Sequence, residues 1–142
     1  MIGKLQTNKV KFAVDIFDYI HSVDNLKLAK KISDEIKKRN KKIKVFIQVN
    51  IGNEFQKSGV QIDGLNSFFE ECKQFENLDI IGLMCLPPMN DDSDIYFQKM
   101  NTLSKQLNLP ELSMGMSQDY LSAASNNASF VRIGTKIFGE RN

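Results

Sequence analysis

Short apolar runs alternate along this chain with longer stretches of helical period. The strand-like runs cover Tyr19 to Val23, Ile43 to Ile51, Asp79 to Leu86, Leu112 to Met114 and Phe130 to Ile133. Glycine, proline, asparagine or aspartate stands at most of the junctions, as is typical of positions where a chain turns. The pattern therefore predicts strands and helices in regular alternation.

The segments between these runs predict three amphipathic helices and a short fourth one. Asp24 can cap the first, the second follows Asp63, the third spans Asp94 to Leu107, and the fourth begins at Ser117 or Gln118. The lysines of the first helix are interpreted as a solvated face. The apolar positions expected to be buried are Leu28, Ala29, Ile32 and Ile36, then Leu65, Phe68, Phe69, Cys72 and Phe75, then Tyr96, Met100, Leu103 and Leu107.

This order of elements predicts an α/β fold with parallel strands, right-handed crossovers and helices that cover the sheet. A doubly wound sheet and a (β/α)8 barrel both fit the pattern. In both architectures the ligand lies at the carboxyl ends of the strands, so the residues that follow each strand are the ones to inspect.

Composition narrows the class of protein. The 142 residues are 42% hydrophobic and 25% charged with a net charge of +2, which is typical of one globular domain and does not demand a nucleic-acid partner. No apolar run approaches the roughly 20 residues of a membrane helix, and no signal peptide is visible, so a cytoplasmic location is expected. Cys72, Cys85 and His21 are too few for a four-ligand metal site, and each thiol is expected to be buried.

Two strand ends carry glycine and hydroxyl residues. Gly115 precedes Ser117 at the start of the predicted fourth helix, and Gly134 is followed by Thr135 after the last strand. Free N–H groups, a glycine that allows close approach and a hydroxyl donor together suit a phosphate, and such a pair of loops occurs after the last two strands of many barrels. The alternative is that Ser117 only caps its helix and Gly134 only turns the chain.

Arg132 interrupts the last apolar run and leaves two interpretations open. Pointing inward, its guanidinium needs a partner, and one candidate is a ring nitrogen of a bound cofactor. Pointing outward, it would pair with a carboxylate on a helix-covered face.

Seven ordered blocks then carry a resemblance: Ile2 to Lys9 (IGKLQTNK), Ile20 to Asp24 (IHSVD), Gln48 to Ile51 (QVNI), Lys57 to Gly59 (KSG), Gly82 to Met84 (GLM), Leu112 to Ser117 (LSMGMS), and Val131 to Arg141 (VRIGT through IFGER). They make the chain similar to the pyridoxal phosphate homeostasis protein family, which resembles the barrel domain of alanine racemase. The blocks span nearly the whole chain.

The resemblance implies a (β/α)8 TIM-barrel type fold that carries pyridoxal 5'-phosphate at its mouth and buffers or delivers this cofactor without robust racemase or transaminase activity. Ser117, Gly134 and Thr135 would hold the phosphate and Arg132 would face the pyridine nitrogen, while Met84 and Asn50 would lie near the ring. An arginine there leaves the ring a weaker electron sink than a carboxylate does, which is consistent with low catalytic competence.

The family's Schiff-base lysine belongs to a segment that precedes the match, so covalent attachment is not expected in this chain. Residues 1–142 are therefore expected to form the C-terminal part of one barrel domain, an incomplete barrel of about five strands with two open edges, an uncovered apolar interior and a tendency to self-associate. Two alternatives stay open. One is a racemase-like enzyme that depends on pyridoxal phosphate, and the other is a noncatalytic piece of a split barrel.

Two further residues have no assigned chemistry. His21 is interpreted as a packed, hydrogen-bonded side chain rather than a proton shuttle. Lys57, within the Lys57-Ser58-Gly59 block, is interpreted as a loop anchor and not as a replacement for the missing lysine.

Overall fold

Five parallel strands form one curved sheet in the computed structural model, which describes residues 1–89 and 91–140. They are β1 (Tyr19–Val23), β2 (Lys44–Val49), β3 (Asp79–Cys85), β4 (Glu111–Met116) and β5 (Phe130–Arg132). The order in the sheet is β1-β2-β3-β4-β5 and every neighbouring pair is parallel. The five predicted strands are thereby confirmed, with ends that differ by at most a few residues.

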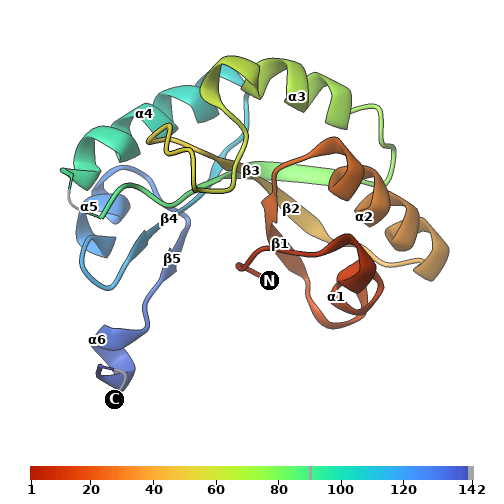
Figure 1. The fold of residues 1–142 in the computed structure, drawn as a ribbon, viewed down its shortest axis with the longest axis horizontal. Coiled ribbons are helices and arrows are strands. Elements are labelled where there is room, and N and C mark those ends of the chain that lie inside the picture. The colour runs from red at the N-terminus through yellow and green to blue at the C-terminus, as the bar shows by residue number, and fades with distance from the viewer. Residues whose placement is uncertain (90, 141–142) are drawn as a thin grey trace.

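The helices are α1 (Val10–Ile16), α2 (Leu26–Arg39), α3 (Leu65–Cys72), α4 (Ser93–Gln106), α5 (Tyr120–Ser125) and α6 (Thr135–Phe138), with short 3-10 turns η1 (Thr7–Lys9) and η2 (Ile62–Gly64). Helices α2 to α5 follow the convex side of the sheet, whereas α6 projects beyond the end of β5 (Figure 1). Helices α1 and α6 are not among the predicted elements, because their short apolar patterns are too brief to indicate a period.

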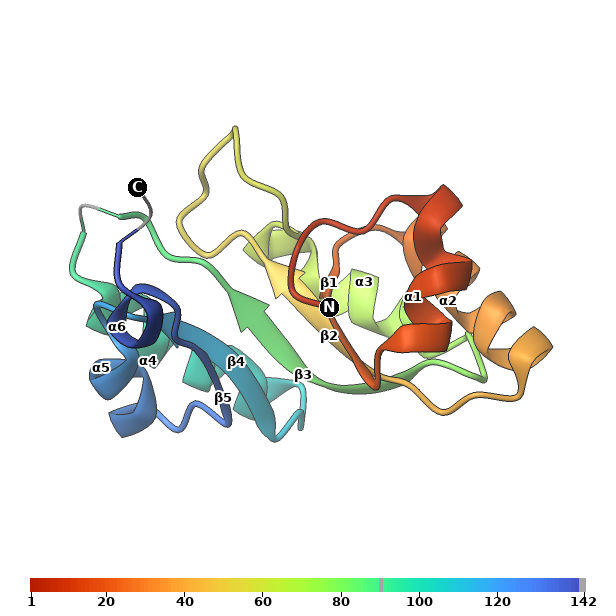
Figure 2. The same cartoon turned by 90° about the horizontal axis from the view of Figure 1, so that it is seen from below.

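The strand order decides between the two predicted architectures. A doubly wound sheet reverses its strand order at a switch point, whereas here each strand lies beside the next one in sequence. The sheet also curls so far that the rings of Tyr19 in β1 and Phe130 in β5 pack in a tilted arrangement with centroids 5.3 Å apart. The architecture is therefore a half-barrel of five β/α units (Figure 2).

Local hydrogen bonds set the helix ends and correct two predictions. Asn25, and not Asp24, caps α2, because its side chain accepts from Leu28 N at 2.9 Å. Helix α5 begins at Tyr120 rather than at Ser117 or Gln118, because Asp119 accepts from Met116 N at 2.6 Å and closes a turn first. The third predicted helix matches α4, which Asp92 caps.

The main core lies between the convex face and the helices. Residues of β1 and alternate residues of β2, β3 and β4 point into it, and they meet the apolar faces that the sequence predicts for α2 and α3. Phe75 lies beyond the end of α3 but still packs against this core, as do the partly buried Phe69 and Tyr96. The sheet contributes Ile20, Val45, Ile47, Val49, Leu83, Cys85, Leu112 and Met114, and the helices Leu28, Ile32, Ile36, Leu65, Phe68, Phe97 and Met100.

The concave interior differs from the expectation of an uncovered apolar surface. Phe46 and Met84 point to this side and are fully buried. The ring of His21 stacks on Phe46 with centroids 4.3 Å apart, and Phe130 packs edge-on against both rings. The prediction was wrong here because curling brings the side chains of β1 and β5 together, and they fill the space between them.

The outer edge of β1 is also less open than expected. Met1 N donates to Tyr19 O at 2.7 Å, His21 N donates to Met1 O at 2.8 Å, and the Ser22 hydroxyl donates to Gly3 O at 2.7 Å. Residues 1–3 thus pair with β1 in the manner of a parallel neighbour. No helix of the described residues is long and apolar enough to cross a membrane.

Candidate functional site

The carboxyl ends of β4 and β5 lie side by side and bring the two glycine-hydroxyl loops together. Met116 is in register with Arg132, so Ser117 and Gly134 follow neighbouring strands. The Ser117 hydroxyl accepts from Gly134 N at 3.1 Å and from Lys136 N at 3.3 Å. One hydroxyl and two amide groups therefore gather at one exposed point. The prediction that Ser117 starts a helix was wrong, because its hydroxyl joins two loops instead.

Gly134 leaves open space at this point. A Cβ atom built on Gly134 would meet nothing within 4 Å. Its φ is −118°, which other residues adopt readily, so the turn itself does not require glycine. Thr135 follows as the first residue of α6 and is exposed. A small group could therefore approach the Gly134 backbone closely without any rearrangement.

The guanidinium of Arg132 points into the half-barrel. Nη1 donates to the Ser113 hydroxyl at 2.8 Å and Nη2 donates to Cys85 O at 2.8 Å. Nε is buried and has no hydrogen-bond partner, and no carboxylate of residues 1–89 and 91–140 forms an ion pair with Arg132. Burial lowers the pKa of Arg132 from its usual value. Of the two orientations that the sequence leaves open, the structure has the inward one.

His21 lies beside Arg132 in the same interior. Its Nδ1 is 2.8 Å from the Ser113 hydroxyl, across 92 residues of chain. Burial, the positive N-terminus and Arg132 lower the pKa of His21 to about 4, so the ring is neutral near pH 7. His21 is thus a packed and hydrogen-bonded side chain, in agreement with the sequence interpretation.

Met84 and Asn50 occupy different surroundings. Met84 is fully buried on the concave face, in register with Gln48 of β2 and Ser113 of β4. The Asn50 amide is engaged by its own loop, since it donates to Glu54 O at 2.9 Å and accepts from Glu54 N at 3.1 Å. Roles for these two residues beside a cofactor ring stay predictions.

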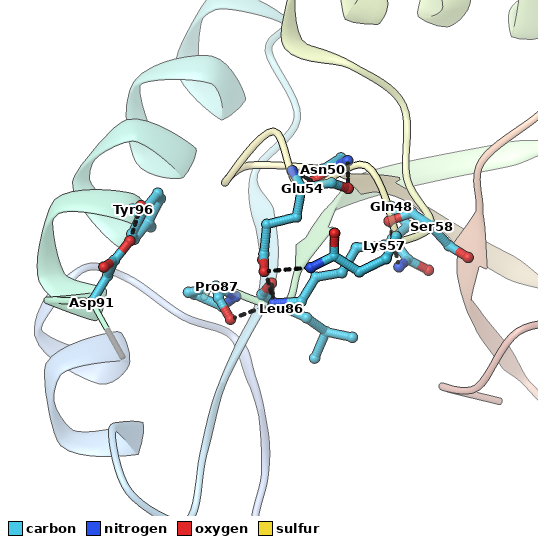
Figure 3. Close-up of polar contacts among 10 residues, drawn as sticks. Gln48, Asn50, Glu54, Lys57, Ser58, Leu86, Pro87, Asp91 and Tyr96 are labelled. Atoms are coloured by element: carbon cyan, nitrogen blue, oxygen red, sulfur yellow. Dashed lines mark hydrogen bonds and ion pairs between the residues drawn. The ribbon is translucent and has the colours of Figure 1, made fainter. Parts of the chain in front are cut away.

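Lys57 ties two loops together at the mouth of the half-barrel (Figure 3). Its Nζ donates to Pro87 O at 3.0 Å and Leu86 O at 3.4 Å and pairs with Glu54 at 2.5 Å. The loop anchor predicted for this block therefore joins the β2–α3 loop to the end of β3. A cavity of about 300 Å³ lies next to it, lined by Lys4, Gln48 and Gln56 among others.

The two cysteines are buried and free. Burial raises the pKa of each thiol to about 12, which keeps the sulfur protonated and unreactive near pH 7. In the part of the chain that the structure describes, no three His, Cys, Asp or Glu side chains are grouped to hold a metal ion.

Comparison of the sequence with models of known domain families identifies the family of this chain. The model of the alanine racemase N-terminal domain matches residues 1–142. The chain belongs to this family. Its sequence is 42% identical to the pyridoxal phosphate homeostasis protein of Aquifex aeolicus over 149 aligned residues, and 31% identical to that of Escherichia coli over 148. Each alignment covers 99% of this chain, but the chain spans only 65% and 63% of those two relatives.

Solved structures of this family have the same fold. PipY of Synechococcus elongatus with pyridoxal phosphate bound superposes with a TM-score of 0.88 at 32% identity, over 96% of this chain and 68% of PipY. PipY without the cofactor gives a TM-score of 0.90. Alanine racemase from Corynebacterium glutamicum, at 19% identity and a TM-score of 0.66 over 92% of this chain and 38% of its own, shares the fold.

Sequence reasoning missed three contributors to this region. Ser113 and the carbonyl of Cys85 hold Arg132, and Lys136 N completes the group around Ser117. Ser113 stands within an apolar strand, so an isolated polar residue on the inward face was the available signal. The two backbone groups carry no signal in the sequence, because every residue has them.

Proposed function

We propose that this chain binds pyridoxal 5'-phosphate noncovalently at the carboxyl ends of β4 and β5 and serves in homeostasis of this cofactor. The open cradle at Gly134 carries the proposal, because it leaves room for a phosphate against a backbone amide. The Ser117 hydroxyl and the amides of Gly134 and Lys136 gather around the same point, and the Thr135 hydroxyl follows directly. All four groups carry a donor hydrogen, and the two amides can exchange their bonds to the Ser117 oxygen for bonds to phosphate oxygens.

Arg132 supplies the second feature of the proposed site. Its buried Nε lacks a partner, and a pyridine nitrogen is an acceptor that an arginine can satisfy without a proton transfer. When bound, pyridoxal phosphate supplies an electron sink that an arginine partner leaves weak. The names of the relatives and the cofactor bound to PipY support the same reading. Buffering or delivery of the cofactor is the role that we propose, in line with the name of the relatives.

Gly134→Ala tests the proposal. The added methyl group enters open space at an allowed φ, so the fold and its melting temperature should not change. The methyl group should nevertheless hold a phosphate away from the amide, and we expect the affinity for pyridoxal phosphate to fall about tenfold or more, as for loss of a charge-assisted hydrogen bond. Absorbance titration of the purified chain, checked by equilibrium dialysis, measures this.

Gly64→Ala is the matched control. Gly64 also has nothing within 4 Å of an added Cβ, and it lies at the end of η2, remote in sequence from both loops. The affinity of the Gly64→Ala variant for pyridoxal phosphate should equal that of the unaltered chain. Equal affinities of all three proteins for pyridoxal phosphate would show that the Gly134 cradle does not hold the phosphate.

We also propose that the chain self-associates through its β5 edge. β5 is the last strand of the described sheet, and Val131 within it and Ile137 and Phe138 of the following α6 are exposed apolar residues. Unpaired strand edges with apolar neighbours favour association. A cytoplasmic location stays a prediction from the sequence.

A further inference from the structure

Three polar side chains from three different strands form a continuous chain of hydrogen bonds inside the half-barrel. His21 comes from β1, Ser113 from β4 and Arg132 from β5. Both His21 Nδ1 and Arg132 Nη1 lie 2.8 Å from the Ser113 hydroxyl oxygen. Ser113 and Arg132 lie on neighbouring strands, and the curling of the sheet brings His21 of β1 to them.

The chemistry of the three groups sets the direction of each hydrogen bond. A guanidinium only donates, so the Ser113 oxygen accepts from Arg132. Ser113 is fully buried, and its own O–H therefore needs an acceptor. The neutral ring of His21 offers Nδ1 for this purpose, which places the ring proton on Nε2. Protonated His21 would instead leave the Ser113 hydrogen without an acceptor and set a second positive charge near Arg132.

Aromatic packing holds the ring of His21 in place at the start of this chain. Phe46 stacks on it at 4.3 Å with an interplanar angle of 16°, and Phe130 lies edge-on at 5.4 Å. At the other end, Nη2 of Arg132 is held by Cys85 O. The guanidinium is therefore oriented from two sides, and Nε is the buried group left without a partner.

We propose that His21 is a positioning residue, which acts through Ser113 to orient the Arg132 guanidinium for a ligand with a pyridine-type ring nitrogen. This inference rests on the proposed function and adds a residue to it. His21 itself does not touch the ligand. His21 therefore affects only how strongly the site prefers a ligand with a ring nitrogen over one with a carbon at that position, because other residues make the proposed phosphate contacts.

Two variants of His21 separate positioning from packing. His21→Asn keeps a hydrogen-bond acceptor at the place of Nδ1, because Oδ1 of asparagine and Nδ1 of histidine are both bonded to Cγ. His21→Phe keeps an aromatic ring for the stack on Phe46 but removes the acceptor. Affinities are measured for pyridoxal phosphate and for its carbocyclic analogue, in which C–H replaces the ring nitrogen.

The ratio of the two affinities is the readout. The unaltered chain and His21→Asn should prefer pyridoxal phosphate by about tenfold, the effect of one charge-assisted hydrogen bond. His21→Phe and Ser113→Ala should bind both ligands nearly equally, with unchanged affinity for the analogue. A preserved preference in His21→Phe would overturn the positioning role. Failure of the unaltered chain to bind either ligand would instead overturn the proposed function.

A second measurement, made without ligand on the unaltered chain, tests the proposal even if the His21→Phe variant does not fold. Nitrogen-15 NMR of the unaltered chain near pH 7 should show His21 as the neutral tautomer with an unprotonated Nδ1 and a protonated Nε2. A proton on Nδ1 would mean that the ring donates to Ser113, and the proposal would then be wrong.

Discussion

Arg132 shows how much a single residue depends on its neighbours in space. Its place in an apolar strand predicts either a buried or a helix-facing side chain, and each choice requires a different partner. The structure supplies the Ser113 hydroxyl and the Cys85 carbonyl, from two other strands, in place of a carboxylate. A buried cation held only by neutral acceptors is costly, which favours a site that a ligand completes.

The pKa of His21 predicts how stability depends on pH. The pKa is about 4 in the folded chain and 6.5 in the unfolded chain, so the unfolded state binds the proton first as the pH falls. The stability that neutral His21 contributes is therefore complete above pH 6.5 and is lost between pH 6.5 and 4. We expect a loss of about 3 kcal/mol over this range, measured by urea unfolding at several pH values.

His21→Phe provides the control, because it removes this titration and should flatten the profile between pH 6.5 and 4. The groups that depress the pKa of His21, apart from burial itself, are the positively charged N-terminus and Arg132. An equally steep profile in the variant would show that other groups cause the acid sensitivity.

At the scale of elements, the mouth of the half-barrel is held by contacts between two loops. We call the contacts of Lys57 with Leu86 O, Pro87 O and Glu54 the strap. Lys57 holds the β2–α3 loop against the carbonyls that follow β3 (Figure 3), and Asn50 fixes the same loop from its other end. Gly59, two residues after Lys57, lets the chain pass close to the backbone of Asn50, because its φ is +127° and a Cβ would lie 2.5 Å from Asn50 N.

Lys57→Met should loosen this strap while leaving the sheet intact. The substitution keeps an unbranched side chain but removes the charge that binds Leu86 O, Pro87 O and Glu54. We expect hydrogen exchange at the amides of Asn53, Glu54 and Lys57 to become about tenfold faster, since bonds to a charged donor each contribute about 1.5–3 kcal/mol.

Amides within β2 should keep their protection in this variant. Lys73→Met serves as the comparison, because Lys73 pairs with Glu70 on the exposed face of α3 and makes no contact with the mouth. Unchanged exchange in the 50–61 loop of Lys57→Met would show that the loop does not rely on the lysine.

At the scale of the whole molecule, the β5 end is where association is expected. Phe138 is 85% exposed on α6, the helix that follows β5. Phe138→Asp places a charge in the proposed contact and should shift the chain toward the monomer, as measured by light scattering over a range of concentrations.

Phe55→Asp is the matched control, since Phe55 is a fully exposed aromatic residue on the distant β2–α3 loop. It should leave the association unchanged. A monomer at every concentration in the unaltered chain would refute association through β5.

The amino-acid sequence by itself determined the elements and the family. Period-2 and helical patterns are local, so β1 to β5 and α2 to α4 could be predicted from neighbouring residues. Short helices and caps could not, because a single hydrogen bond such as that from Met116 N to Asp119 decides where α5 begins. The glycine-hydroxyl loops were also visible in the sequence.

Only the tertiary structure decided how those elements meet. Curling of the sheet brings His21, Ser113 and Arg132 together across as many as 92 residues and buries Phe46 and Met84 in an interior expected to be open. It also turns the Ser117 hydroxyl from a presumed cap into a link between two loops. Sequence patterns report which face of an element is buried, whereas the partner across the barrel follows from curvature and register, which are properties of the whole sheet.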